Sequence, residues 1–202
     1  MSDAGSDAGS AFLSYEREPA KRVFVAELRE ATKTFKDTED EKSPMYVLLP
    51  TGERCNRVLL VGTITQKDKV GDQNILYRAR VSDPTGLLFV TAGLYQPEAM
   101  HQLAKIDPER SVFVAVVGKP SVYTTPEGKV ITSVRAESVP VVDQETRDLW
   151  VQDAARSTLD RIDVSTAETP SSDVLLARET YRFGLEHWRR MVYNALSRVM
   201  TL

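Results

Sequence analysis

Arginine, lysine and aromatic side chains recur in the middle of the sequence, at spacings suited to binding a polyanion that carries flat bases. Arg78 and Arg80 are two positions apart, so an extended strand carries both on one face. Cationic side chains bind phosphates and aromatic rings stack on bases, and this combination is typical of single-stranded nucleic-acid binding. The candidate binding residues are Lys67, Lys69, Arg78, Arg80, Phe89, Thr91, Tyr95, Lys119, Tyr123 and Lys129.

Several of these residues also have an ordinary structural explanation. Phe89 could be covered by the N-terminal segment and belong to the core, and Tyr123 could be a packing cover in its loop. Arg78 and Arg80 could pair with acids on a neighbouring strand. The set taken together favours binding, and no base specificity is expected because every base has a π-face.

Catalytic motifs are absent from the sequence. It contains no G-x-x-x-x-G-K-[ST], G-x-G-x-x-G, H-E-x-x-H or G-x-S-x-G, and no pair of acids has a spacing typical of shared metal or proton chemistry. His101, His187 and the single Cys55 cannot build a zinc site of the Cys/His type, and one cysteine excludes an internal disulfide. We therefore expect no enzyme, no cofactor and no metal.

Five short strands and one helix are predicted to position the candidate residues. β-branched and aromatic runs bounded by turn residues predict strands over 56–66, 73–82, 87–95, 111–118 and 129–139. Pro97 opens a helix predicted over 97–106, between the third and fourth strands. The run Asp83-Pro84-Thr85-Gly86 predicts a tight turn, so the second and third strands should form a hairpin.

Alternation assigns the faces of that hairpin. The predicted inward residues are Ile75, Tyr77, Ala79, Val81, Leu88, Val90, Ala92 and Leu94. The predicted outward residues are Leu76, Arg78, Arg80, Ser82, Leu87, Phe89, Thr91 and Tyr95. The order of elements predicts a mainly β fold: a five-stranded OB-fold Greek-key barrel over 57–140, with an N-terminal strand extension and C-terminal helices. The exposed face of such a barrel commonly binds single-stranded nucleic acid.

Composition fits one domain with extensions. The chain has 202 residues, 42% of them hydrophobic, and a formal net charge of −3, which argues against a generally basic nucleic-acid binder. The charge is uneven, since residues 57–140 hold 10 Lys and Arg against 8 Asp and Glu, whereas both flanks are acidic. A small basic excess is equally consistent with an ordinary solvated surface.

The N-terminal part divides into a tail and an extension. Residues 1–14 repeat S-D-A-G and are expected to be disordered, with neither a signal peptide nor a membrane anchor. Residues 15–56 contain two apolar runs, 23–28 and 45–49, which fit two strands or a helix and a strand. We expect them to add edge strands to the barrel. No stretch is long enough to span a bilayer, so the expected location is the cytoplasm, in association with the nucleoid.

Helical periodicity follows the predicted barrel. Asp143 is a candidate N-cap for a helix over 143–163, a polar linker covers 164–172, and a second helix is expected over 173–202. The apolar stripes of these helices fit an oligomerisation interface, or alternatively a helix that lies back on its own barrel. The candidate partner-interface residues are Trp150, Val151, Ala155, Leu159, Ile162, Tyr181, Leu185, Trp188, Val192 and Val199.

Three segments resemble a known family. They are R-E-P-A-K-R-V-F-V-A-E-L from Arg17, S-P-M-Y-V-L-L-P-T-G-E-R-C-N-R-V-L-L-V-G-T-I-T from Ser43, and D-P-T-G-L-L-F-V-T-A-G-L-Y-Q-P-E-A from Asp83. Together they resemble the archaeal replication protein A associated proteins, which are similar to the middle subunit of eukaryotic replication protein A. The resemblance covers about residues 17–162.

The resemblance implies a subunit of a hetero-oligomeric single-stranded DNA binding complex that acts in replication, repair and recombination. Tyr123 then matches a base-stacking aromatic in the last loop and Phe89 one near the third strand, while the helix over 143–163 would join other OB-fold subunits. The final thirty or so residues depart from the pattern, because they are too few for a winged-helix domain. The rival reading is a scaffold subunit whose barrel surface is occupied by protein and never touches DNA.

Overall fold

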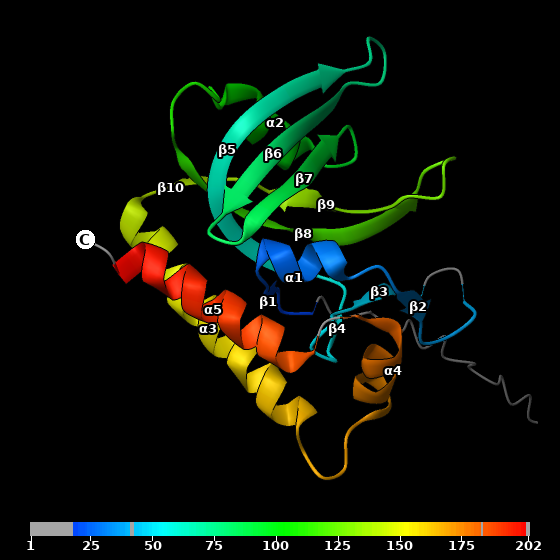
Figure 1. Cartoon of the computed structure of the whole chain (residues 1–202). Coiled ribbons are helices and arrows are strands. Elements are labelled where there is room, and N and C mark those ends of the chain that lie inside the picture. The colour runs from blue at the N-terminus through cyan, green and yellow to red at the C-terminus, as the bar shows by residue number, and fades with distance from the viewer. Residues whose placement is uncertain (1–17, 41–42, 183, 201–202) are drawn as a thin grey trace, which may run out of the picture.

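The computed structural model describes residues 18–40, 43–182 and 184–200, so the predicted tail over 1–14 lies outside the described residues. The strands are β1 (Lys21–Arg22), β2 (Thr34–Lys36), β3 (Met45–Leu48), β4 (Arg54–Cys55), β5 (Val58–Val70), β6 (Leu76–Asp83), β7 (Gly86–Gly93), β8 (Phe113–Thr124), β9 (Val130–Ser138) and β10 (Val141–Val142). The helices are α1 (Val25–Glu30), α2 (Pro97–Lys105), α3 (Gln144–Ser165), α4 (Ser172–Thr180) and α5 (Leu185–Met200). Figure 1 shows the curved strands above and the C-terminal helices below them.

Five strands close into a ring. The order is β5-β6-β7-β9-β8, and β8 pairs again with β5. Strands β5 to β7 are consecutive and β8 returns beside β5, which is a Greek-key arrangement, and β9 closes the ring by pairing parallel to β7. The fold is therefore OB-like, as predicted. It is a mixed α and β structure rather than a mainly β one, because helices occupy about as much of the described chain as strands do.

Two hairpins are longer than the sequence predicts. β5 continues to Val70 and β8 to Thr124, so Lys67, Lys69, Lys119 and Tyr123 lie on strands rather than in loops. Gly71 and Gly128 have φ values of 81° and 82°, a conformation that favours glycine, at the turns that follow. Polar side chains do not end a strand when the ladder of backbone hydrogen bonds continues.

Helices α1 and α2 lie at opposite ends of β7. α2 follows Gly93, whereas α1 lies beside the turn before β7, where Val25 N donates to Asp83 Oδ2 at 2.8 Å. Val25 and Leu28 of α1 are fully buried in the same core as the ring. The runs 23–28 and 45–49 are a helix and a strand, α1 and β3, as in the second alternative, but the prediction that they add edge strands to the ring is wrong. Among the described N-terminal residues, only the two of β1 join the ring, and β2, β3 and β4 form a separate three-stranded sheet.

The C-terminal part forms three helices. Asp143 caps α3, since its side chain accepts a hydrogen bond from Thr146 N. The predicted single helix over 173–202 is instead α4 and α5, because the chain leaves the helical path at Tyr181, whose hydroxyl donates to Leu48 O at 2.6 Å. α5 then packs along α3 (Figure 1). Within the described residues, no helix combines the length and apolar character needed to cross a membrane.

Candidate nucleic-acid interface

Strand register brings the central candidates into two rows on the outside of the ring. Arg80 of β6 lies opposite Phe89 of β7, and Arg78 lies opposite Thr91. The second row continues from Thr91 to Arg135 of β9, and from Arg135 to Lys119 of β8. We call these residues the basic face, which consists of Arg78, Arg80, Phe89, Thr91, Lys119 and Arg135. Their neighbours along the strands, such as Ala79 and Val90, are fully buried, so the basic face points away from the core.

Phe89 lies between two guanidinium groups. The guanidinium carbon of Arg78 is 5.4 Å from the centre of the ring and that of Arg80 is 5.3 Å from it. Both arginines are exposed and Phe89 is half-buried. Arg78 also donates to Asp68 at 3.4 Å, but ion pairs this exposed are worth only about 0.2–1 kcal/mol. The basic face therefore offers two exposed cations beside a half-buried aromatic ring.

Arg135 is a member that the sequence analysis missed. It is exposed, and its neighbours in β9, Val134 and Ala136, are fully buried. It lies opposite Thr91 of β7. The alternation of V-I-T-S-V-R-A contains the signal. The prediction of faces covers the second and third strands alone, so it does not include Arg135.

Lys67 and Lys69 do not join the basic face. The pairing of β5 with β6 shifts between Ile64 and Gln66, a bulge that reverses the alternation beyond it. Lys67 consequently lies opposite the buried Ala79, and Lys69 lies opposite Tyr77. The placement of these two lysines with the arginines is thus corrected.

The ammonium group of Lys67 has a structural role. It donates to the carbonyl oxygens of Leu103, Ala104 and Ile106 at 3.0, 3.1 and 2.5 Å. These are the last carbonyls of α2, which lack partners within the helix, and a cation is favourable at this end of the helix dipole. Lys67 therefore holds α2 against the ring.

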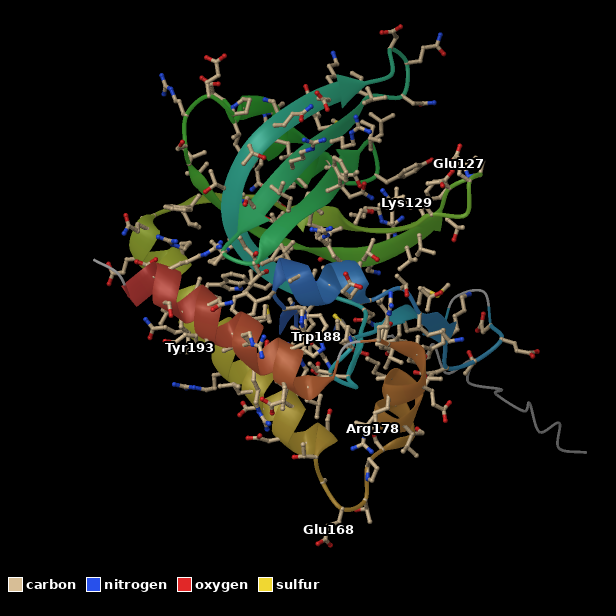
Figure 2. The ribbon with its side chains drawn as sticks, viewed as in Figure 1. Glu127, Lys129, Glu168, Arg178, Trp188 and Tyr193 are labelled. Carbon is tan, nitrogen blue, oxygen red and sulfur yellow. The ribbon has the colours of Figure 1, made fainter. Side chains whose placement is uncertain are left out.

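The remaining aromatic and loop candidates lie at the margins of the basic face. Tyr123 is 60% exposed. It lies on the same face of β8 as Lys119, about 13 Å farther along the strand. Lys129 is exposed at the tip of the β8–β9 loop, where Figure 2 shows it near Glu127. Tyr95 is 95% exposed but lies beyond the end of β7.

The end of β7 also corrects one inward assignment. Leu94, predicted to point into the core, is 52% exposed. β7 ends at Gly93, and Gln96 N donates to Gly93 O at 2.9 Å as the chain turns into α2. Alternation does not extend through such a turn.

Most of the candidate partner-interface residues are covered by their own chain. The buried members are Trp150, Val151, Ala155, Ile162, Trp188, Val192 and Val199. Trp150 Nε1 donates to Leu59 O at 3.1 Å, so α3 is anchored on β5. The arrangement corresponds to the alternative of a helix that packs back on its own domain. Leu159 is 37% exposed, and the outer side of α5 presents Tyr193, which is 71% exposed, whereas Trp188 points inward (Figure 2).

Outside the basic face, the described residues include a cavity and a buried cysteine. A cavity of about 610 Å³ lies beside α3 and α4, but its cations are paired: Lys21 with Glu53 at 2.6 Å and Arg54 with Asp173 at 2.7 Å. Burial raises the pKa of the Cys55 thiol to about 12, which makes it a poor nucleophile. In the described part of the chain, no group of three His, Cys, Asp or Glu side chains is arranged to hold a metal.

No family model and no curated protein matches the sequence, so the resemblance to the archaeal replication protein A associated proteins stays a prediction. Among solved structures, the chain is similar to one in the crystal structure of yeast Stn1 and Ten1, with 6% identity, coverage of 63% of each chain and a TM-score of 0.43. It is also similar to the single-stranded DNA binding protein from Thermus aquaticus, with 17% identity over 55% of this chain and 56% of that one, at a TM-score of 0.36. Asparaginyl-tRNA synthetase from Pyrococcus horikoshii has 17% identity over 50% of this chain and 26% of that one, at a TM-score of 0.35. The chain spans less than two thirds of each of these three, and similarities of this level assign no function.

Proposed function

We propose that this protein binds single-stranded DNA without sequence preference, as a subunit of a hetero-oligomeric complex of the replication protein A kind that serves replication, repair and recombination. The observation that carries the proposal is the half-buried ring of Phe89 between the exposed guanidinium groups of Arg78 and Arg80. It lies on the outside of an OB-like ring of strands, where folds of this class commonly hold nucleic acid.

The chemistry of the basic face suits an unpaired strand. Arg78, Arg80, Arg135 and Lys119 form a band of positive charge across four neighbouring strands, on which a phosphate backbone can lie. Phe89 offers a stacking surface, and the exposed Tyr123 offers a second one toward the end of β8. Each stacked base contributes about 1–3 kcal/mol of binding free energy, whatever its identity.

The partner subunits in this proposal are other OB-fold proteins, which contact the C-terminal helices. Because the apolar seam between α3 and α5 is buried within the chain, such contacts belong on the outer sides of these helices. Leu149, Val164 and Tyr193 are exposed there, with 59%, 66% and 71% of their surface accessible.

The second candidate function is that of a scaffold whose basic face binds an acidic partner protein instead of DNA. The net charge of −3 favours this rival, because much of the chain outside the ring repels a polyanion. In that case the purified protein binds no oligothymidine, with or without partner subunits.

The test replaces the two arginines that flank Phe89, in the double variant Arg78→Gln/Arg80→Gln. Binding of a fluorescent oligothymidine is measured by anisotropy between about 50 and 200 mM salt. Since each phosphate contact to a single strand contributes about 0.7 to the slope of log K against log salt, the double variant should lose up to about 1.4 from that slope. Affinity should fall about fivefold or more for each arginine at 0.1 M salt.

The matched control is Arg156→Gln, an exposed arginine on α3 away from the basic face. It should leave both affinity and slope unchanged. If the wild-type protein and the double variant bind oligothymidine with the same slope of log K against log salt, the basic face is excluded as the binding site.

A further inference from the structure

A second basic surface lies between the lower end of the ring and helix α5. Two cavities of about 270 and 330 Å³ adjoin there, and both are lined by Pro84 and Arg198. The first is also lined by Thr63, Ser82, Phe113 and Arg147, and the second by Arg190 and Asn194. We call the two cavities together the α5 groove.

The α5 groove continues from the basic face. Ser82 follows Arg80 by two positions on β6, so both side chains lie on the same side of the sheet. Ser82 lies opposite Thr63 of β5, and Thr63 lies opposite Phe113 of β8. The groove therefore begins one row of residues below the row that holds Arg80 and Phe89.

Arg147 is held in a position from which it can bind an anion. Its guanidinium carbon lies 4.7 Å from the centre of the Phe113 ring, and its Nε lies 2.6 Å from Asp148 Oδ1. Despite this distance, neither Arg147 Nε nor Asp148 Oδ1 has a hydrogen-bond partner within the described residues, so the guanidinium keeps a donor for an anion. Because Phe113 lies beneath the guanidinium, this position offers donors to a phosphate rather than a surface to a base.

Helix α5 supplies the other two cations of the groove. Arg190, Asn194 and Arg198 recur at intervals of four, so they share one face of the helix. Arg198 donates through Nη1 to Pro84 O at 2.6 Å, which fixes it above the β6–β7 turn, and Arg190 is exposed. The carboxylate of Asp83, which also lines the groove, accepts hydrogen bonds from the backbone of Val25, Thr85 and Gly86, and burial raises its pKa. The groove thus has an excess of positive charge.

We propose that the α5 groove binds the phosphates of the same single strand after it leaves the basic face, so that the C-terminal helices lengthen the binding track beyond the ring of strands. This inference rests on the proposed function. The three arginines Arg147, Arg190 and Arg198 are phosphate-binding residues in this arrangement, and the groove contributes no base recognition.

The test compares two lengths of oligothymidine with the wild-type protein and the triple variant Arg147→Gln/Arg190→Gln/Arg198→Gln. An oligomer of about 4 nucleotides, the lower limit for one OB-fold, can be held by the basic face alone, whereas one of about 20 exceeds the site of a single OB-fold and can reach the groove. The triple variant should lose up to about 2 from the salt slope for the longer oligomer, since each phosphate contact contributes about 0.7. Its affinity for the shorter oligomer should stay within about twofold of wild type, because the groove lies outside the site that oligomer occupies.

Lysine variants separate charge from structure. Arg147→Lys/Arg190→Lys/Arg198→Lys keeps the three positive charges and should retain most of the affinity for the longer oligomer. An equal loss in the lysine and glutamine variants would show a structural effect and overturn the inference. So would an unchanged salt slope in the glutamine variant. If the wild-type protein binds neither oligomer, the proposed function itself fails, which is a different outcome from loss of the groove alone.

Discussion

At the scale of single residues, the basic face depends on the choice of arginine beside Phe89. A guanidinium group is planar and weakly hydrated, so it can lie over a ring and still donate to a phosphate. Arg78 and Arg80 both lie over the ring from β6, at nearly equal distances from its centre. Phe89 therefore orients the two cations before any ligand arrives, which lowers the entropy lost on binding.

Replacing Phe89 by leucine tests the ring itself. Leucine keeps an apolar side chain at this half-buried position but offers no π-face. We expect Phe89→Leu to weaken oligothymidine binding by about 1–3 kcal/mol, in a direct titration at constant salt. Phe89→Tyr is the control and should bind like wild type. Equal affinities of the leucine and tyrosine variants would show that no base stacks on residue 89.

At the scale of elements, a buried ion pair joins α1 to α3. Arg161 Nη2 donates to Glu27 Oε2 at 2.7 Å, and Glu27 is fully buried. Thr158 and Thr51 add hydroxyl groups to the same network, with Arg161 Nε 3.1 Å from Thr51 Oγ1. The pair fixes how the helix that closes one end of the ring meets the C-terminal helices.

Removal of one partner from this pair should be costly. Arg161→Met leaves the Glu27 carboxylate buried without its counter-ion, and we expect a loss of about 3–5 kcal/mol in the free energy of unfolding measured with urea. The double variant Glu27→Leu/Arg161→Met removes both charges and should recover much of that loss. Single and double variants of equal stability would contradict the assignment of a coupled pair.

Local patterns predict the elements of the ring better than those around it. The hairpin of β6 and β7 follows from its alternation and from the turn at 83–86, and these signals are local. α1 is different, because Val25 N and Ala26 N are held by Asp83 and Thr85, 58 and 59 positions away. The β-branched residues of this segment favour a strand, but these long-range hydrogen bonds stabilise a helix instead.

The candidate site was predicted in the same uneven way. Arg78, Arg80 and Phe89 were placed together because alternation holds along both strands. Lys67 is predicted in a loop, but β5 continues to Val70, and the bulge after Ile64 turns Lys67 away from the arginines. The α5 groove combines side chains from β5, β6, β8, α3 and α5, so no local sequence pattern marks it.

At the scale of the whole molecule, the ring and the helices share one hydrophobic core. Phe24 contacts Trp150 of α3 edge to face at 5.5 Å, and Val192 and Ala195 of α5 belong to the same buried cluster as the inner side of the ring. The protein should accordingly unfold as one cooperative unit.

Substitution of Trp188 tests whether the protein unfolds cooperatively. Trp188 is 1% exposed on α5, so Trp188→Ala should cost about 3–5 kcal/mol, and Trp188→Phe should cost less. The helical circular dichroism and the fluorescence of Trp150 should change at the same urea concentration in both variants. Loss of the helical signal at a lower urea concentration than the fluorescence change would show that α5 forms a separate folding unit.

The pair of Glu27 and Arg161 also bears on synthesis at the ribosome. The two residues are 134 positions apart, so Glu27 leaves the exit tunnel long before its counter-ion is made. Until then the carboxylate stays hydrated, because burying it without its counter-ion is costly, and α1 does not pack in its final position. During this interval the apolar residues that α1 covers in the folded protein stay exposed, and chaperones that recognise apolar surface can bind them.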